Sequence, residues 1–190
     1  MPTDYLNLSL GDVRAELGAI ARDAQAAFAA LDGPRLNWRP SATQWSVAQC
    51  LDHLLNANRE MFEAMDAALD PARPRSVWQR LPVLPRLFGR ALIRSQRPEA
   101  TRKFTAPQAA QPASSAIDAG ILERFVEAQH AAAARAGALD PAAAARTVMV
   151  SPFVAFITYT VLDGWRVIVT HEHRHVEQAR RVTQAPGFPA

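Results

Sequence analysis

The feature of this chain that most constrains its fold is a helical period of apolar residues, which recurs in four separate stretches. In the first stretch, residues 9–31, the apolar side chains lie three or four positions apart. That spacing places them on one face of an α-helix, and such a face must be covered by another element. The same spacing recurs over residues 46–70, 115–136 and 152–182. Four amphipathic helices are therefore predicted.

The beginnings of two stretches carry helix-capping patterns. Ser46 and Gln49 fit a capping box, in which side chain and backbone at the first turn exchange hydrogen bonds. Ser9 and Asp12 form a similar starting pattern, and Gly137 ends the third stretch. These signals predict where the helices begin and end.

A long proline- and arginine-rich segment joins the second and third stretches. Residues 71–114 contain seven prolines, and within them a short helix is expected from Pro85 to Ser95. The one expected extended piece is Arg146–Val150. We predict an all-α fold, a four-helix bundle over residues 1–190 as one domain, with residues 71–114 as a crossover insert between helices two and three.

Composition favours a cytoplasmic protein without a membrane partner. The N-terminus lacks a signal-peptide pattern, no apolar run reaches the length of a membrane span, and Cys50 is a lone cysteine. Residues 71–110 hold nine basic residues against one acid, Glu99. Because no nucleic-acid-binding motif accompanies them, we interpret this segment as a solvated arginine-rich surface and expect no nucleic-acid partner.

The sequence His171-Glu172-His173-Arg174-His175 fits the zinc-protease pattern H-E-x-x-H. The extended form of that motif needs glycine at position 178 and histidine at 181, where this chain has Gln178 and Arg181. The fifteen residues after His175 contain one acid, Glu177, on the same helix. A zinc-protease site is therefore not predicted.

The helical period places His171 and His175 about 40° apart on the helix surface, in line with the apolar stripe. Both side chains should face the interior, whereas His173 should be exposed to solvent. Two inward imidazoles one turn apart can bind one metal ion. They can equally be hydrogen-bonded histidines at the edge of the core, and the sequence leaves both interpretations open.

Two other histidines could supply a third ligand. His130 lies among alanines at the flank of the third stretch, where a surface position is expected. His53 lies off the main apolar stripe of its helix, on the side shared by Cys50 and Ala57. Periodicity permits either solvent or a second groove between helices for His53.

Two stretches together resemble the DinB-like (DinB/YfiT) superfamily: NWRPSATQWSVAQCLDHLLNANREMF, residues 37–62, and HEHRHVEQ, residues 171–178. The matching features are Trp38 with Pro40, then Trp45-Ser46, then a histidine eight residues after Trp45, and finally H-x-x-x-H-x-x-Q. The resemblance extends from about residue 8 to residue 182 and implies a four-helix bundle that holds a divalent metal with three histidines. Carried over by position, these ligands are His53, His171 and His175.

The resemblance also implies a function. Three imidazoles leave a coordination position open, as in catalytic sites. The metal is expected to be zinc or nickel, ahead of iron or manganese, and a low-molecular-weight thiol is an expected cosubstrate. The family implies a metal-dependent enzyme acting on a small molecule, a thiol-dependent S-transferase or a hydrolase, and a homodimer. The alternative is a non-catalytic, metal-stabilised dimeric bundle that acts in interactions or stress response.

The sequence leaves two interpretations open for each of two further residues, Glu172 and Cys50. Glu172 could act as a base or orient a ligand, but a structural pairing with Arg174 or a neighbouring helix is favoured. Cys50 lies one turn before His53 and could approach the metal, but free cysteines are more often small buried apolar residues.

Overall fold

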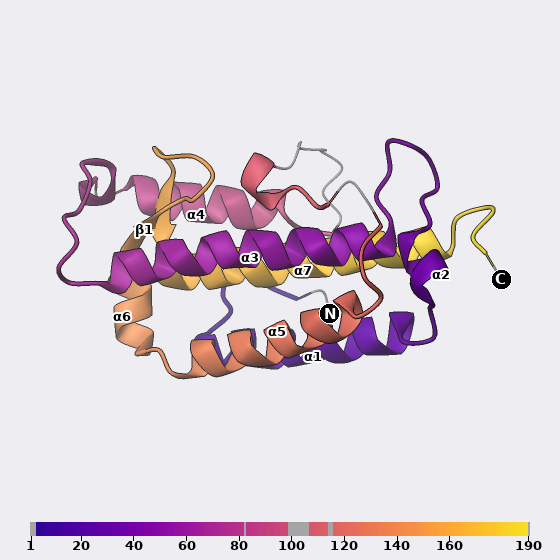
Figure 1. Cartoon of the computed structure of the whole chain (residues 1–190). Helices are drawn as coiled ribbons and strands as arrows, with labels where there is room; N and C mark the ends of the chain where they lie inside the picture. Colours follow the sequence, from indigo (N-terminus) through magenta and orange to yellow (C-terminus); the bar gives the residue numbers. More distant parts are fainter. Residues whose placement is uncertain (1–2, 82, 99–106, 114–115, 190) are drawn as a thin grey trace.

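A computed structural model describes residues 3–81, 83–98, 107–113 and 116–189 of the chain. Most of these residues are helical, which confirms the all-α prediction (Figure 1). The four long helices are α1 (Leu10–Phe28), α3 (Val47–Leu69), α5 (Ile121–Gly137) and α7 (Val161–Thr183).

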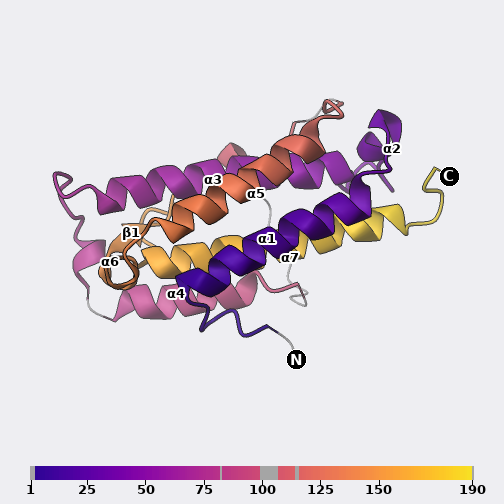
Figure 2. The same cartoon turned by 90° about the horizontal axis from the view of Figure 1, so that it is seen from below.

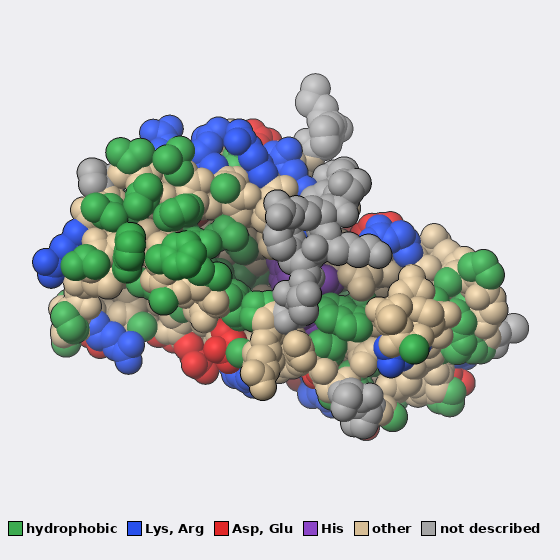
Figure 3. Space-filling model, turned by 90° about the horizontal axis from the view of Figure 1, so that it is seen from above, with side chains coloured by type: hydrophobic (Ala, Val, Ile, Leu, Met, Phe, Trp, Pro, Cys, Tyr) green, Lys and Arg blue, Asp and Glu red, His purple; other side chains and the backbone are tan. Residues whose placement is uncertain are grey.

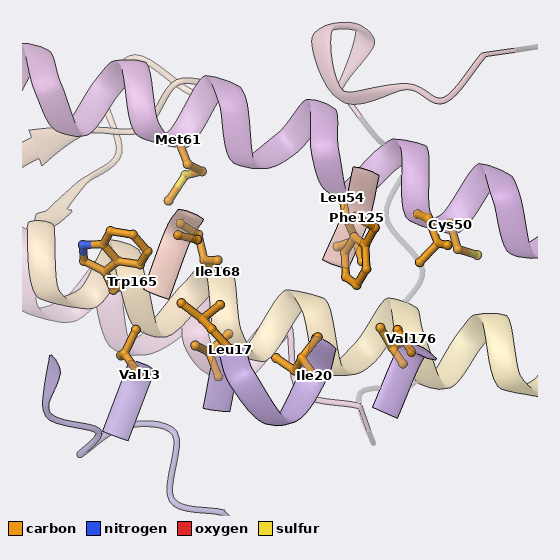
Figure 4. Close-up of a cluster of buried hydrophobic side chains, with 14 of the residues drawn as sticks. Val13, Leu17, Ile20, Cys50, Leu54, Met61, Phe125, Trp165, Ile168 and Val176 are labelled. Atoms are coloured by element: carbon orange, nitrogen blue, oxygen red, sulfur yellow. The ribbon is translucent and has the colours of Figure 1, made fainter. Parts of the chain in front are cut away.

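Each long helix packs against two of the others. α1 packs on α5 and α7, and α3 packs on α7 and α5 (Figures 1 and 2). Apolar side chains from all four helices fill the space between them (Figure 4). Val13 and Leu17 of α1, Leu54 of α3, Phe125 of α5 and Trp165 of α7 have no solvent-exposed surface. The apolar stripes of the sequence therefore meet in one core.

Shorter elements lie around these helices. They are α2 (Gly33–Asn37), η1 (Trp78–Arg80), α4 (Leu84–Ser95), η2 (Gln108–Ala110), α6 (Pro141–Arg146), β1 (Val148–Val150) and β2 (Thr158–Thr160). β1 and β2 pair antiparallel, with Met149 opposite Tyr159. α4 packs against α7 and β2, so the short helix predicted at Pro85–Ser95 is present.

The predicted caps are present. The backbone N–H of Gln49 donates to Ser46 Oγ over 3.1 Å, and the N–H of Ser46 donates to Gln49 Oε1 over 3.2 Å. Ser9 and Asp12 make the equivalent pair of hydrogen bonds at the start of α1. The short 3₁₀ helices η1 and η2 were not predicted. Two short α-helices were also not predicted: α2 begins after Asp32 and α6 after Asp140, each capped by that aspartate.

The last helix begins later than the sequence predicted. Its expected start was residue 152, but α7 begins at Val161, because Thr160 Oγ1 accepts the N–H of Asp163 and caps the helix there. Residues 148–160 instead form the β1–β2 hairpin. β1 lies within the predicted extended piece, and β2 was not predicted.

The third predicted stretch and the crossover reach beyond the part that is described. α5 begins at Ile121, while the predicted start at Ser115 lies outside the described residues, as do Glu99, Arg102 and Lys103 of the basic segment. Within the described ranges, no helix combines the length and apolarity that crossing a membrane requires.

Candidate metal centre

Three histidines from two neighbouring helices lie together. His53 comes from α3, and His171 and His175 come from consecutive turns of α7. The ring centroid of His53 lies 4.9 Å from that of His171 and 4.6 Å from that of His175. One nitrogen from each ring can be chosen so that all three lie within 4.8 Å of one another. The three residues named from the family resemblance are thus brought to one place.

A backbone carbonyl fixes the orientation of His53. His53 Nδ1 is hydrogen-bonded to the carbonyl oxygen of Ala110. A carbonyl can only accept, so Nδ1 carries the proton and Nε2 keeps its lone pair. That Nε2 lies 3.1 Å from His171 Nε2. The lone pair of His53 is therefore directed at the other histidines.

The segment that supplies this carbonyl is fastened to α3. The N–H of Ala113 donates to Asp52 Oδ2 over 2.9 Å, and Gln49 Nε2 donates to the carbonyl of Ala113 over 3.0 Å. Residues 107–113 contain η2, which packs against α3. Metal-binding histidines commonly donate their second N–H to a carbonyl in this way, which sets the tautomer and ring orientation.

The spacing of the nitrogens suits a metal ion. Two nitrogens 3.1 Å apart that each lie about 2.05 Å from one ion subtend an angle of about 100° at it, near the tetrahedral value of about 109°. His175 Nδ1 is buried and has no hydrogen-bond partner in the described part of the chain. An imidazole nitrogen left unpaired in this way is available as a ligand. The donor set therefore fits a divalent ion.

The surroundings keep all three rings neutral. Burial lowers the pKa of His53, and it lowers the pKa of His171 well below its ordinary value, helped by the neighbouring His175 and His53. Burial, His53 and Arg174 together lower the pKa of His175 to about 3. Neutral imidazole is the form that binds metals. The site is thus ready to bind a metal at neutral pH without first losing protons.

Trp45 forms an apolar wall of the site. Its ring lies 4.8 Å from the ring of His53 and 5.7 Å from that of His175. Histidine surface is visible in the middle of one face of the molecule (Figure 3). Trp45 belongs to the family pattern, but its position beside the histidines was not predicted.

Glu172 belongs to a different cluster. It is fully buried between helices, where its Oε1 accepts Nδ2 of Asn58 over 2.6 Å and Nε2 of Gln129 over 2.8 Å. Burial raises its pKa to about 7. The favoured structural interpretation holds, with partners on α3 and α5. Asn58 and Gln129 were not predicted, although polar residues on an apolar stripe are a signal for such a network.

The remaining candidates are not part of the histidine cluster. His130 is exposed on α5, as predicted. His173 is half-buried rather than solvent-exposed, because its Nε2 lies 2.7 Å from Glu16 Oε2 and its ring packs on Tyr5. Cys50 is buried in the core, and burial raises the pKa of its thiol to about 12, so it is neither a ready ligand nor a nucleophile.

Fold and site together define a mostly helical protein in which three clustered histidines could bind one metal ion. The chain belongs to the DinB superfamily, whose family model matches residues 16–179. Neither the curated proteins nor the solved structures gave a match.

Proposed function

We propose that His53, His171 and His175 bind one divalent metal ion and that the protein is a metal-dependent enzyme. The observation that carries this proposal is the convergence of three neutral imidazoles, with His53 Nε2 and His171 Nε2 3.1 Å apart. Burying three imidazoles side by side is costly unless each finds a partner. A shared metal ion supplies that partner.

The number of ligands supports a catalytic rather than a structural role. Structural zinc sites usually have four protein ligands, whereas catalytic sites have three and keep a position open. Within the described residues, the cluster contains three candidate ligands and no fourth. Imidazole donors suit zinc and nickel, and we place iron and manganese behind them.

The chain's own residues prepare this site in separate ways. Ala110 holds His53 in the tautomer that presents Nε2, and Trp45 covers the rings of His53 and His175 on one side. When bound, the metal lowers the pKa of a coordinated water or thiol and polarises a substrate carbonyl. Glu172 takes no part as a base, because both neighbouring amides hold it in the core.

The reaction class we infer is thiol-dependent S-transfer or hydrolysis on a small molecule. Membership of the DinB superfamily and an open three-histidine site support it. We further infer that the four long helices form the family's four-helix bundle as one domain over residues 1–190, with residues 71–114 as an insert. A homodimer stays a prediction, which light scattering of the purified protein would test.

The test is a reaction screen on matched protein samples. Protein loaded with zinc or nickel is assayed for transfer of cysteine or glutathione to an aryl halide and for hydrolysis of activated esters and amides. Activity should require metal and disappear in His53→Ala, while His130→Ala, which changes an exposed histidine, should keep it. A metal-loaded protein without activity across this screen would favour the non-catalytic, metal-stabilised bundle.

A further inference from the structure

Large apolar side chains are exposed at one end of the molecule, apart from the histidines. In the described part of the chain, the large hydrophobic residues that are exposed are Val77, Trp78, Leu81, Val83, Leu87 and Phe156. All but Phe156 come from eleven consecutive positions that include η1 and the start of α4. They gather on the face that contains α4 and the hairpin (Figure 3). Exposed apolar groups that cluster in this way mark interaction surfaces.

The backbone beneath this apolar surface is anchored to the rest of the fold. Gln79 Nε2 donates to the carbonyl of Val148 in β1 over 2.7 Å. Thr158 Oγ1 in β2 donates to the carbonyl of Trp78 over 3.5 Å, and Pro85, Gly89 and Ile93 of α4 are buried. The exposed side chains therefore project from a fixed support, with Val77 70% and Val83 61% exposed.

The charges on the segment that carries most of these apolar side chains have one sign. Between residues 71 and 98 every charged residue is an arginine, and there are seven of them. The exposed ones are Arg73, Arg75, Arg80, Arg86 and Arg94. Acidic residues lie beside this surface at the end of α3, where Glu63, Asp66 and Asp70 line a cavity with Arg73, and Asp66 is paired with Arg135. The segment that carries the apolar side chains is thus positively charged, and the acidic residues beside it come from α3.

The arginines and the exposed apolar side chains together indicate which kind of partner binds this surface. A second copy that packs this segment against itself across a two-fold axis would bring the arginines of both copies close together, and like charges close together at an interface are unfavourable. A partner must therefore offer both negative charge and an apolar phase. A lipid surface with anionic headgroups offers both, and tryptophan and arginine are typical of the boundary between headgroups and acyl chains.

We propose that this end of the molecule, formed by η1, the start of α4 and the β1–β2 loop, binds peripherally to membranes rich in anionic phospholipid. Val77, Trp78, Val83 and Leu87 enter the boundary region, and the surrounding arginines contact phosphate groups. The expectation of no membrane partner rested on the absence of a spanning segment, which peripheral binding does not need. The proposal does not depend on the metal site.

The test uses the full-length protein and sedimented vesicles. Vesicles of phosphatidylcholine with 40% phosphatidylglycerol should retain at least tenfold more protein than vesicles of phosphatidylcholine alone. Tryptophan emission should shift to the blue on binding, because Trp78 is the one exposed tryptophan of four: Trp165 is buried, and Trp38 and Trp45 are half-buried. Binding should weaken as salt is raised from 50 to 300 mM, since exposed charges are screened.

Variants separate the apolar contribution to membrane binding from the electrostatic contribution. Val83→Ser with Leu87→Ser should remove most binding, and Arg80→Gln should lower it about fivefold, the contribution of one arginine near an anionic surface. Arg22→Gln, which changes an exposed arginine on α1, is the matched control and should bind like the parent. Melting temperatures of all variants establish that they are folded.

Two results would overturn the proposal. The first is the absence of binding to anionic vesicles at low salt, or binding that the serine variant does not reduce. The second is a concentration-dependent dimer in light scattering that Val83→Ser with Leu87→Ser dissociates, since this surface would then be an interface between copies of the chain.

Discussion

His171 and Glu172 are consecutive residues of α7, yet they belong to two polar clusters of different chemistry, one of imidazoles and one of a carboxyl with two amides. His171 joins His53 and His175, where His175 Nδ1 is buried without a hydrogen-bond partner in the described residues. Glu172 turns into the core between α3 and α5, where two side-chain amides donate to it. The first cluster brings the ring nitrogens of three imidazoles together, with His53 Nε2 and His171 Nε2 3.1 Å apart. The second cluster joins a carboxyl to two amides, and it too contains buried atoms without a partner in the described residues, Glu172 Oε2 and Gln129 Oε1.

The residues of one sequence motif, H-E-x-x-H, therefore belong to two different clusters in the folded chain. In H-E-x-x-H zinc proteases the glutamate works beside the metal-binding histidines. The step of about 100° between consecutive residues is the same in both cases, but here Glu172 is covered by α3 and α5 and accepts hydrogen bonds from Asn58 and Gln129. The histidines are suited to bind a ligand, while the glutamate links α7 to α3 and α5 through hydrogen bonds.

The largest expected effect is on metal-linked stability. At a free metal concentration a thousandfold above its dissociation constant, zinc or nickel should raise the free energy of unfolding by about 4 kcal/mol. His171→Ala should abolish this gain, whereas Asn58→Ala, in the other cluster, should retain it. Chemical denaturation with and without metal measures both. An equal gain in the free energy of unfolding in His171→Ala would mean that His171 is not a ligand.

The second effect concerns the carboxyl of Glu172 in the metal-free protein. Burial raises its pKa from 4.5 to about 7, so the folded chain keeps a proton that the unfolded chain releases in this pH window. The free energy of unfolding should therefore fall, on the order of 3 kcal/mol, as pH rises from 4.5 to 7. Glu172→Gln cannot ionise and should lack this fall.

Urea denaturation of parent and Glu172→Gln at pH 5 and pH 8 measures this difference. The histidines have the opposite effect at acid pH. Because their pKa values are lowered in the folded state, the free energy of unfolding falls as pH drops below about 6.5. Both proteins contain the same histidines, so the difference between them isolates Glu172. Parallel changes in the two proteins would mean that this carboxyl is ionised in the fold.

A smaller effect is expected from the segment that orients His53. Asp52→Ala removes the acceptor for the N–H of Ala113 and loosens residues 107–113, whose Ala110 carbonyl holds His53. Metal affinity should fall about 10- to 100-fold, as for other groups that orient a ligand. Competition with a chromophoric chelator measures the affinity, and Asp23→Ala on α1 is the control. Unchanged affinity would mean that the segment does not orient His53.

The smallest effect is expected at Cys50. Cys50→Ala removes a buried thiol from the core and should lower the free energy of unfolding by about 1 kcal/mol. The metal content should stay the same, because Cys50 is fully buried in the hydrophobic core and is not part of the histidine cluster. Loss of metal in this variant would make the thiol a ligand.

The long helices could be predicted from sequence because each has an apolar stripe and most have local end signals. The capping boxes at Ser9 and Ser46 gave the starts of α1 and α3 correctly. The start of α7 was misplaced, because Phe153 and Ile157 continue its apolar spacing by coincidence although they belong to the hairpin region. A period-based prediction cannot detect that change without the pairing of β1 with β2.

The site was only partly predictable. The spacing of His171 and His175 indicated that both face inward, but His53 lies off the main stripe of α3. That helix is covered on a further side by η2, and contact between residues 53 and 110 follows no local rule. The family pattern supplied His53. Neither the helical period nor the family pattern indicated that Glu172 would accept hydrogen bonds from Asn58 and Gln129.

The most direct test of the central claim is elemental analysis of the purified protein beside His53→Ala. We predict about one zinc or nickel ion per chain in the parent after reconstitution, and less than about a tenth of that in the variant. A parent protein that contains no metal after reconstitution with either ion would contradict the three-histidine site. The same metal content in both proteins would contradict the role of His53.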